Sequence, residues 1–209
     1  MEAADTTRFS LETLFAGGRL CLDFINTSCE IRGQELEFLK SGDDLYKWLR
    51  SAEAVYGRQL VGNDKKWSTQ EGEVALTEAL ALREVLHDLA ESVAQKKPAP
   101  VSALEKLNST LRAFPTCSQI ELADGGFAEA ISISNANHAW LAAIAQDAVD
   151  LLCYSDLSLL RQCECPTCVR FFFDTTKNHR RRWCVEKCGS APKAAAYYRR
   201  KVARKAQQS

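Results

Sequence analysis

Five of the nine cysteines lie within 26 residues near the C-terminus, and this cluster restricts the possible folds more than any other feature. The chain reads CECPTCVRFFFD from residue 163, and a second group, CVEKC, begins at residue 184. Paired cysteines on short turns are typical of zinc sites, because backbone N–H groups point at the sulfurs while both side chains reach one metal. A folding unit this short has too little apolar core to be stable without a metal or crosslinks.

A tetrahedral zinc site needs four ligands, so one of the five thiols is spare. Cys168, Cys184 and Cys188 are the firmer candidates. The common two-residue turn favours Cys165 as the partner of Cys168, whereas a spacing of four residues from Cys163 is also geometrically possible. We therefore expect one structural Zn²⁺ whose first ligand is either Cys163 or Cys165.

Other uses of the cysteines fit the sequence less well. A thioredoxin-like redox motif would need a surrounding βαβ pattern, which is missing here. The N-terminal residues MEAADTTRF carry acids and have no apolar core typical of a secretory signal, so we expect a cytoplasmic protein with reduced thiols. The remaining cysteines are predicted to be small buried hydrophobes; they are Cys21, Cys29, Cys117 and Cys153.

The formal net charge of the chain is zero, but its two parts carry opposite charges. From Arg161 onward there are 13 Lys and Arg against three Asp and Glu, a net charge of +10, which leaves −10 for the preceding residues. A basic segment of this kind indicates a polyanionic partner. The candidate nucleic-acid contacts are Lys177, Arg180, Arg181, Arg182, Lys193, Arg199, Arg200, Lys201, Arg204 and Lys205.

The fold class predicted from the sequence is α+β, mainly α. A helical domain with a small antiparallel sheet is expected over residues 1–158, and a small zinc finger of treble or ribbon type with a basic helix over 159–209. Ser68 with Glu71 and Ser102 with Glu105 have the pattern of capping boxes. Helices are expected at 41–55, 68–95, 102–114 and 137–154, and strands at 17–27, in VRFFFD and on both sides of the Asp-Gly-Gly turn within 117–134.

Few residues outside the cysteine cluster indicate a chemical role. There is no phosphate-binding glycine loop, no nucleophile elbow and no histidine–carboxylate metal motif, so we do not expect an enzyme. No run of 18 apolar residues indicates a membrane span. Asp23 and Asn26 are expected to cap or to stabilise a turn, with a small-molecule pocket as the alternative.

The cysteine segment also resembles a known family. The stretch from RQC at 161–163 through the Arg-Trp-Cys at 182–184 to CGSAPKAAAYYRRK at 188–201 resembles the CGNR zinc finger of bacterial proteins, and GGRLCLDFINT followed by DDLYKWLRSAE resembles the start of the ABATE domain. The family's finger has four residues between its first two ligands, which implies Cys163 and disagrees with the spacing argument for Cys165. The sequence departs from the CGNR pattern at Cys188-Gly189-Ser190-Ala191, and its second pair is one residue shorter than the pattern.

The resemblance implies a stress-induced transcription regulator that binds nucleic acid, DNA more than RNA. The N-terminal domain would then sense a small-molecule ligand or mediate homodimerisation. Two other functions remain open. The basic arm could instead bind structured RNA or an acidic protein, or the N-terminal domain could bind a metabolite with the finger as an accessory.

Overall fold

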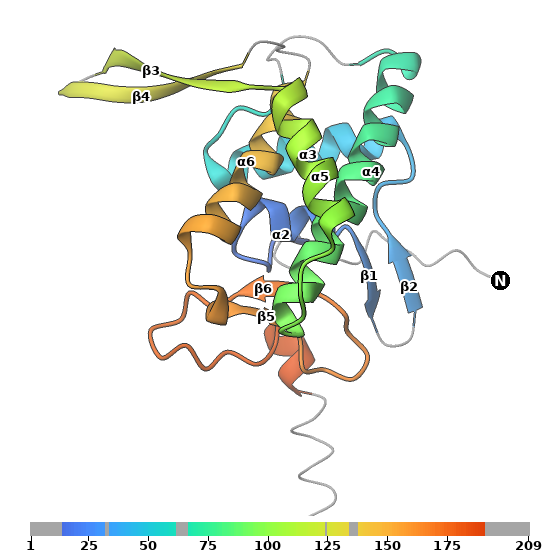
Figure 1. Ribbon diagram of the computed structural model, residues 1–209. Coiled ribbons are helices and arrows are strands. Elements are labelled where there is room, and N and C mark those ends of the chain that lie inside the picture. Colours follow the sequence, from blue (N-terminus) through green and yellow to red (C-terminus); the bar gives the residue numbers. More distant parts are fainter. Residues whose placement is uncertain (1–13, 32–33, 62–66, 124, 134–137, 191–209) are drawn as a thin grey trace, which may run out of the picture.

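The computed structural model describes residues 14–31, 34–61, 67–123, 125–133 and 138–190. Four longer helices surround one short buried helix, and three separate two-stranded antiparallel sheets lie around them (Figure 1). The helices are α2 (Leu20–Ile25), α3 (Gly42–Tyr56), α4 (Thr69–Ala94), α5 (Val101–Ala113) and α6 (Ala139–Tyr154), and the strand pairs are β1–β2 (Ser28–Ile31, Gln34–Glu37), β3–β4 (Thr116–Ala123, Gly126–Ile133) and β5–β6 (Leu160–Gln162, Phe171–Phe173). The mainly helical α+β class predicted from the sequence is confirmed.

The predicted strand at 17–27 is wrong, because this segment forms helix α2. All six residues of the helix are buried, including Asp23. The alternation of apolar residues was misleading, because a helix that is enclosed on every side needs no polar face. In so short an apolar segment, the sequence pattern of a buried helix cannot be told from that of a buried strand.

The long helix α4 begins as the sequence predicts. Ser68 accepts a hydrogen bond from the backbone of Glu71, and the Glu71 side chain accepts one from the backbone of Ser68. The second predicted box, at Ser102, does not form. The carbonyl of Pro100 accepts from the N–H groups of Ala103 and Leu104. Helix α5 therefore begins before Ser102, which lies within the helix and not at its N-cap.

Helices α3 and α4 come into close contact at their N-terminal ends through two glycines. A Cβ atom on Gly42 would lie 2.4 Å from the Cα atom of Gly72. This distance is shorter than any real contact between carbon atoms, so only glycine at position 42 allows the two helices to approach this closely.

The hairpin β3–β4 extends away from the helices (Figure 1). Its two strands and its turn follow the sequence prediction, and Gly125 and Gly126 have positive φ angles of 98° and 156°. Cys117 on β3 and Cys153 near the end of α6 are exposed, so the prediction of a buried thiol is wrong for both. Cys117 is exposed because no element packs on the strand that carries it within the described residues.

The C-terminal strands share the core of the helical part. Leu160 on β5 and Phe171 on β6 belong to the same cluster of buried side chains as helices α2, α4 and α6. The next residue, Phe172, lies among the clustered cysteines instead. Since successive side chains on a strand point to opposite faces, β6 joins the main core on one side to the cysteine cluster on the other. The expected domain boundary at residues 158 and 159 stays a prediction.

No helix in the described ranges is both long enough and apolar enough to cross a membrane.

Candidate metal centre and basic surface

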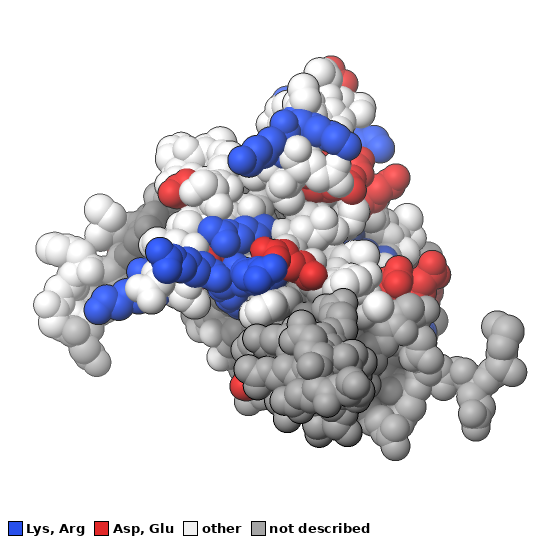
Figure 2. Space-filling view, turned by 90° about the horizontal axis from the view of Figure 1, so that it is seen from below, with Lys and Arg blue, Asp and Glu red and all other residues white. Residues whose placement is uncertain are grey.

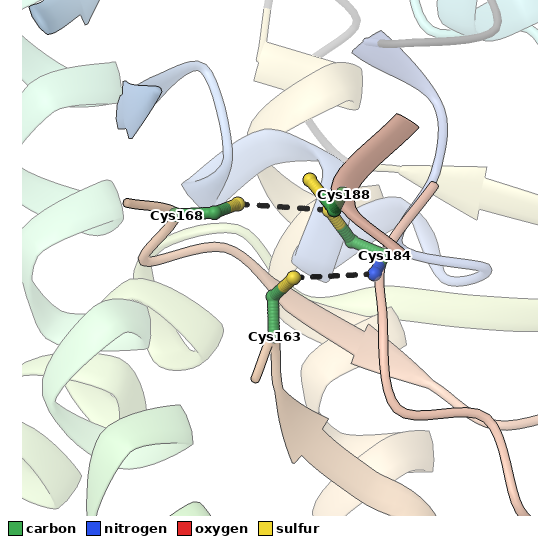
Figure 3. Close-up of side chains that lie close together, drawn as sticks. All are labelled: Cys163, Cys168, Cys184 and Cys188. Atoms are coloured by element: carbon green, nitrogen blue, oxygen red, sulfur yellow. Dashed lines mark hydrogen bonds between the residues drawn. The ribbon is translucent and has the colours of Figure 1, made fainter. Parts of the chain in front are cut away.

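Four cysteine side chains converge at the end of the β5–β6 pair (Figure 3). Cys163 follows β5 and Cys168 precedes β6. Cys184 lies two residues before a short helical segment at 186–190, and Cys188 lies within it. All four are buried, and their sulfur atoms lie within 4.8 Å of one another. The sulfur of Cys184 is 3.7 Å from the sulfurs of Cys168 and Cys188.

These spacings suit a tetrahedral metal. With Zn–S bonds of about 2.3 Å, a regular tetrahedron has S···S edges of about 3.8 Å. A disulfide would need sulfurs at about 2.05 Å, and the nine cysteines are all free. The four-cysteine cluster is therefore consistent with one zinc ion, and its thiols are the soft ligands that zinc prefers.

Cys165, the fifth cysteine of this segment, lies outside the four-sulfur group. Its sulfur is buried and lies 3.6 Å from the Thr167 hydroxyl. The backbone of Cys165, not its side chain, contacts the cluster. Its N–H donates to the sulfur of Cys163, and its carbonyl accepts from the N–H of Cys168 at 3.0 Å. The geometry thus brings together Cys163, Cys168, Cys184 and Cys188.

Backbone donors surround the sulfurs in a repeated pattern. The N–H of Cys165 donates to Cys163, and the N–H of Arg170 donates to Cys168, in both cases from two residues further along the chain. The N–H of Cys184 also points at the Cys163 sulfur, at 3.4 Å. N–H donors stabilise a thiolate, which is the form of cysteine that binds metal.

Arg170 is a functional candidate that the sequence analysis did not single out. Its side chain is only 3% exposed, and its guanidinium donates to the sulfur of Cys168 near Cys184 and Cys29. Burial alone would lower its pKa, but the neighbouring thiolates raise it, so the side chain stays charged. A cation here offsets part of the negative charge of four thiolates around a divalent metal. No sequence pattern marks an arginine as buried.

Hydrogen bonds in the cluster shift the thiol pKa values in opposite directions. Hydrogen bonds with Cys163 and Cys184 lower the pKa of Cys168, whereas hydrogen bonds with Cys163 and Cys168 raise the pKa of Cys184. Burial raises the pKa of Cys188 to about 12.

Asp174 organises the loop between the two cysteine pairs, and sequence analysis missed this role. Its carboxylate is fully buried and accepts hydrogen bonds from the Thr176 hydroxyl, the Thr176 N–H and the Arg181 N–H. Burial would raise the pKa of Asp174, but these donors hold it below its usual value. The Asp-Thr-Thr sequence is a signal that could have indicated such a turn.

The structure places the described candidate basic residues in different roles. Lys177 and Arg180 are exposed, and no ion pair involves either in the part of the chain described. Arg182 forms an ion pair with Glu164 at 2.5 Å. Lys187, which the sequence analysis did not select, is also exposed. In Figure 2 the Lys and Arg side chains gather on part of the face that is seen from below.

Arg181 stabilises the fold of the finger. Its guanidinium donates to the carbonyls of Ala16, Trp183 and Cys184, and it stacks 4.6 Å from the ring centre of Phe172. All these partners are structural, so little of this side chain is available to a ligand. Six candidates lie outside the described residues; they are Lys193, Arg199, Arg200, Lys201, Arg204 and Lys205.

Trp183 lies over the four-cysteine cluster. It packs against the buried cysteines, and a Cβ atom on Gly189 would lie 2.8 Å from its ring. The Nδ1 atom of His179 lies 3.2 Å from the Asp174 backbone carbonyl oxygen.

Asp23 and Asn26 both make structural hydrogen bonds. Asp23 accepts from the N–H of Gly17 at 2.6 Å and from the hydroxyl of Tyr56. Asn26 bonds with both backbone groups of Phe171. The sequence predicted a local turn or capping role for Asn26. In the structure, Asn26 joins two segments that are 145 residues apart in the sequence.

Comparison with known families agrees with these observations. Residues 18–155 match ABATE, described as "Putative stress-induced transcription regulator", and residues 160–201 match the CGNR zinc finger. A comparison with curated proteins found no match. The resemblance inferred from the sequence is confirmed. The chain belongs to the ABATE family, and its C-terminal part is a CGNR zinc finger.

Proposed function

We propose that this protein is a cytoplasmic, DNA-binding transcription regulator of a stress response, whose finger contacts the phosphates of duplex DNA. The observation that carries the proposal is the tetrahedral spacing of four sulfurs directly beside a loop with exposed cations. Lysine and arginine side chains that neutralise phosphates release counterions, which provides most of the affinity of non-specific DNA binding.

The metal in this proposal has a structural role. Cys163, Cys168, Cys184 and Cys188 would hold one Zn²⁺, which supplies a crosslink between two segments of the chain, 163–168 and 184–188. Four protein ligands leave no open position for a substrate or water, so the site has the composition of a structural zinc site. Asp174 and Arg181 then fix the loop from 174 to 183 relative to this crosslink.

Lys177 and Arg180 are the described residues best placed to contact phosphate, because both are exposed and neither forms an ion pair in the described ranges. Arg182 becomes available to contact a phosphate once its ion pair with Glu164 is broken. The six candidates beyond residue 190 supply most of the remaining positive charge.

The test is a salt series of binding to duplex DNA, measured by fluorescence anisotropy on the zinc-loaded full chain. Each phosphate contact contributes about 0.9 to the slope of log K against log salt, so K177A/R180A should lower the slope by about 2. Lys106→Ala with Arg112→Ala, on helix α5 of the other part of the chain, is the matched control and should leave the slope unchanged. A wild-type slope indistinguishable from zero would reject the proposal.

RNA binding is tested by the same titration with a structured RNA of equal length. Tight RNA binding with weak duplex DNA binding would replace the DNA assignment, because it would show that the cations recognise a different polyanion.

An open groove provides a second candidate function, the binding of a small metabolite. It lies between the β1–β2 hairpin and α4, and its lining includes Cys29, Arg83, His87 and Val169. Its volume of about 740 Å³ is in the range of small-molecule sites. A reproducible rise in the Tm of the full chain with one member of a metabolite panel supports this function, and no change across the panel contradicts it.

A further inference from the structure

The hairpin β3–β4 has no covering element in the part of the chain that the structure describes. It extends from the end of α5 and lies apart from the helices (Figure 1). Every residue of β3 after Thr116 is exposed. A two-stranded hairpin is marginally stable in water, and independent stability needs more strands or a packed face. This hairpin therefore has the properties of an element that is covered in a larger assembly.

One face of the hairpin carries three exposed apolar side chains toward its tip. The register places Leu122 directly opposite Phe127, and Ile120 lies two residues before Leu122 on the same face. The three side chains are 85%, 81% and 80% exposed. Gln119 and Glu121 lie on the opposite face, so the apolar side chains are not distributed at random over the two surfaces.

We propose that this apolar face packs against the same face of a second copy of the chain, which makes the protein a two-fold symmetric dimer. In a two-fold contact each copy contributes the same patch, so the apolar face has to match only itself. Roughly 450 Å² per copy for three such side chains is comparable to the largest patch on a typical monomer. Two such patches with the adjacent backbone bury about 1,000 Å², which is the lower bound for a specific interface.

The charges of this segment favour a second copy over a polyanion. Residues 116–133 contain no Lys or Arg, and their acids are Glu121, Asp124 and Glu129. Nucleic acid and anionic lipid surfaces are attracted to cations, so neither is a suitable partner for this hairpin. The register pairs Glu129 with Ile120, further from the tip than Leu122 and Phe127.

The dimer does not depend on the proposed DNA-binding function, because the hairpin and the finger use different residues. If both proposals hold, two fingers act in one particle, and simultaneous binding of two sites raises the apparent affinity without any new contact.

Sedimentation equilibrium on the zinc-loaded full chain tests the dimer directly. The chain mass is 23.3 kDa, and we expect twice this mass for the wild type at about 100 µM, a concentration that populates even a weak dimer. Leu122→Lys should raise the dimer dissociation constant at least about tenfold, because two lysines would be desolvated at the centre of the contact. Gln119→Lys adds the same charge to the same strand on the opposite face, and it should leave the mass of the dimer unchanged.

Both substitutions replace exposed side chains, so circular dichroism and zinc content should match the wild type in each variant. A monomeric wild type at this concentration overturns the proposal. A dimer that persists in Leu122→Lys assigns the contact to another surface and also overturns it, and equal weakening by Gln119→Lys shows that charge on the strand, not its apolar face, is responsible.

Discussion

Asn26 and Phe171 are 145 residues apart in the sequence, and two hydrogen bonds join them. The Asn26 side-chain amide nitrogen donates to the Phe171 backbone carbonyl at 2.8 Å, and the Phe171 N–H donates to the Asn26 side-chain oxygen Oδ1 at 2.9 Å. The amide thus takes the place of a neighbouring strand for β6. It connects the end of α2 to the strand that separates the two groups of buried side chains.

Replacement of Asn26 by Ala should destabilise the whole molecule. Both backbone groups of Phe171 would lose their partner while buried, at a cost on the order of 2–4 kcal/mol. Urea unfolding followed by circular dichroism measures this change. The control is Asn108→Ala on the exposed surface of α5, which should change the free energy of unfolding by less than about 0.5 kcal/mol. Equal effects of the two substitutions would contradict the structural role of Asn26.

Serine substitutions should separate Cys163 from Cys165. Cys163→Ser removes one of the four converging sulfurs, so we expect loss of bound zinc and unfolding of the finger. Cys165→Ser leaves all four sulfurs and the backbone hydrogen bonds of residue 165 in place, so it should retain about one zinc per chain. Metal analysis of the purified variants measures both outcomes. Zinc retained by Cys163→Ser and lost by Cys165→Ser would reverse the assignment.

Asp23 should make the stability of the protein depend on pH. Burial raises the pKa of Asp23 from 3.8 to about 7, although the hydrogen bonds from Tyr56 and Gly17 and the charge of Arg170 oppose the shift, and Asp147 adds to it. Between about pH 4 and pH 7 the folded state keeps a proton that the unfolded state has released. Stability should therefore fall as pH rises through this window.

Asp23→Asn removes this titration and keeps both hydrogen bonds, because the amide oxygen accepts from Gly17 and the amide nitrogen donates to Tyr56. At pH 8 the free energy of unfolding of the variant should exceed that of the wild type by an amount on the order of 4 kcal/mol, and at pH 4 the two should be similar. Asp88→Asn, at an exposed site, is the control and should follow the wild type at both pH values. A difference that does not change with pH would argue against an ionisable Asp23.

The two glycines at the contact of α3 and α4 should respond unequally to alanine. Gly42→Ala would place Cβ 2.4 Å from Gly72, so the helices must separate, at a cost of about 2–3 kcal/mol. Gly72→Ala meets Gly42 only at 3.2 Å and gains up to about 1 kcal/mol of helix propensity, so its effect should be small. The Tm of each variant measures the difference, and equal Tm values would show that the helices adjust freely.

The sequence by itself predicts most of the regular structure and the type of site. Long amphipathic segments and the Ser68–Glu71 capping box indicate the helices, because these signals act within one or two turns of chain. The spacing of the cysteines indicates a thiolate metal site for the same reason, since each pair of ligands lies on one short turn.

Only the tertiary structure decided the features that depend on contacts between distant segments. Helix α2 has no polar face, so its conformation depends on what surrounds it, and the alternating pattern of its sequence gave the wrong prediction. The selection of Cys163 over Cys165 for the four-sulfur group depends on where Cys184 approaches β5, 21 residues later in the chain. The roles of Arg170 beside the cysteines and of Asn26 at β6 were also visible only in the tertiary structure, because burial and long-range hydrogen bonds have no local sequence signal.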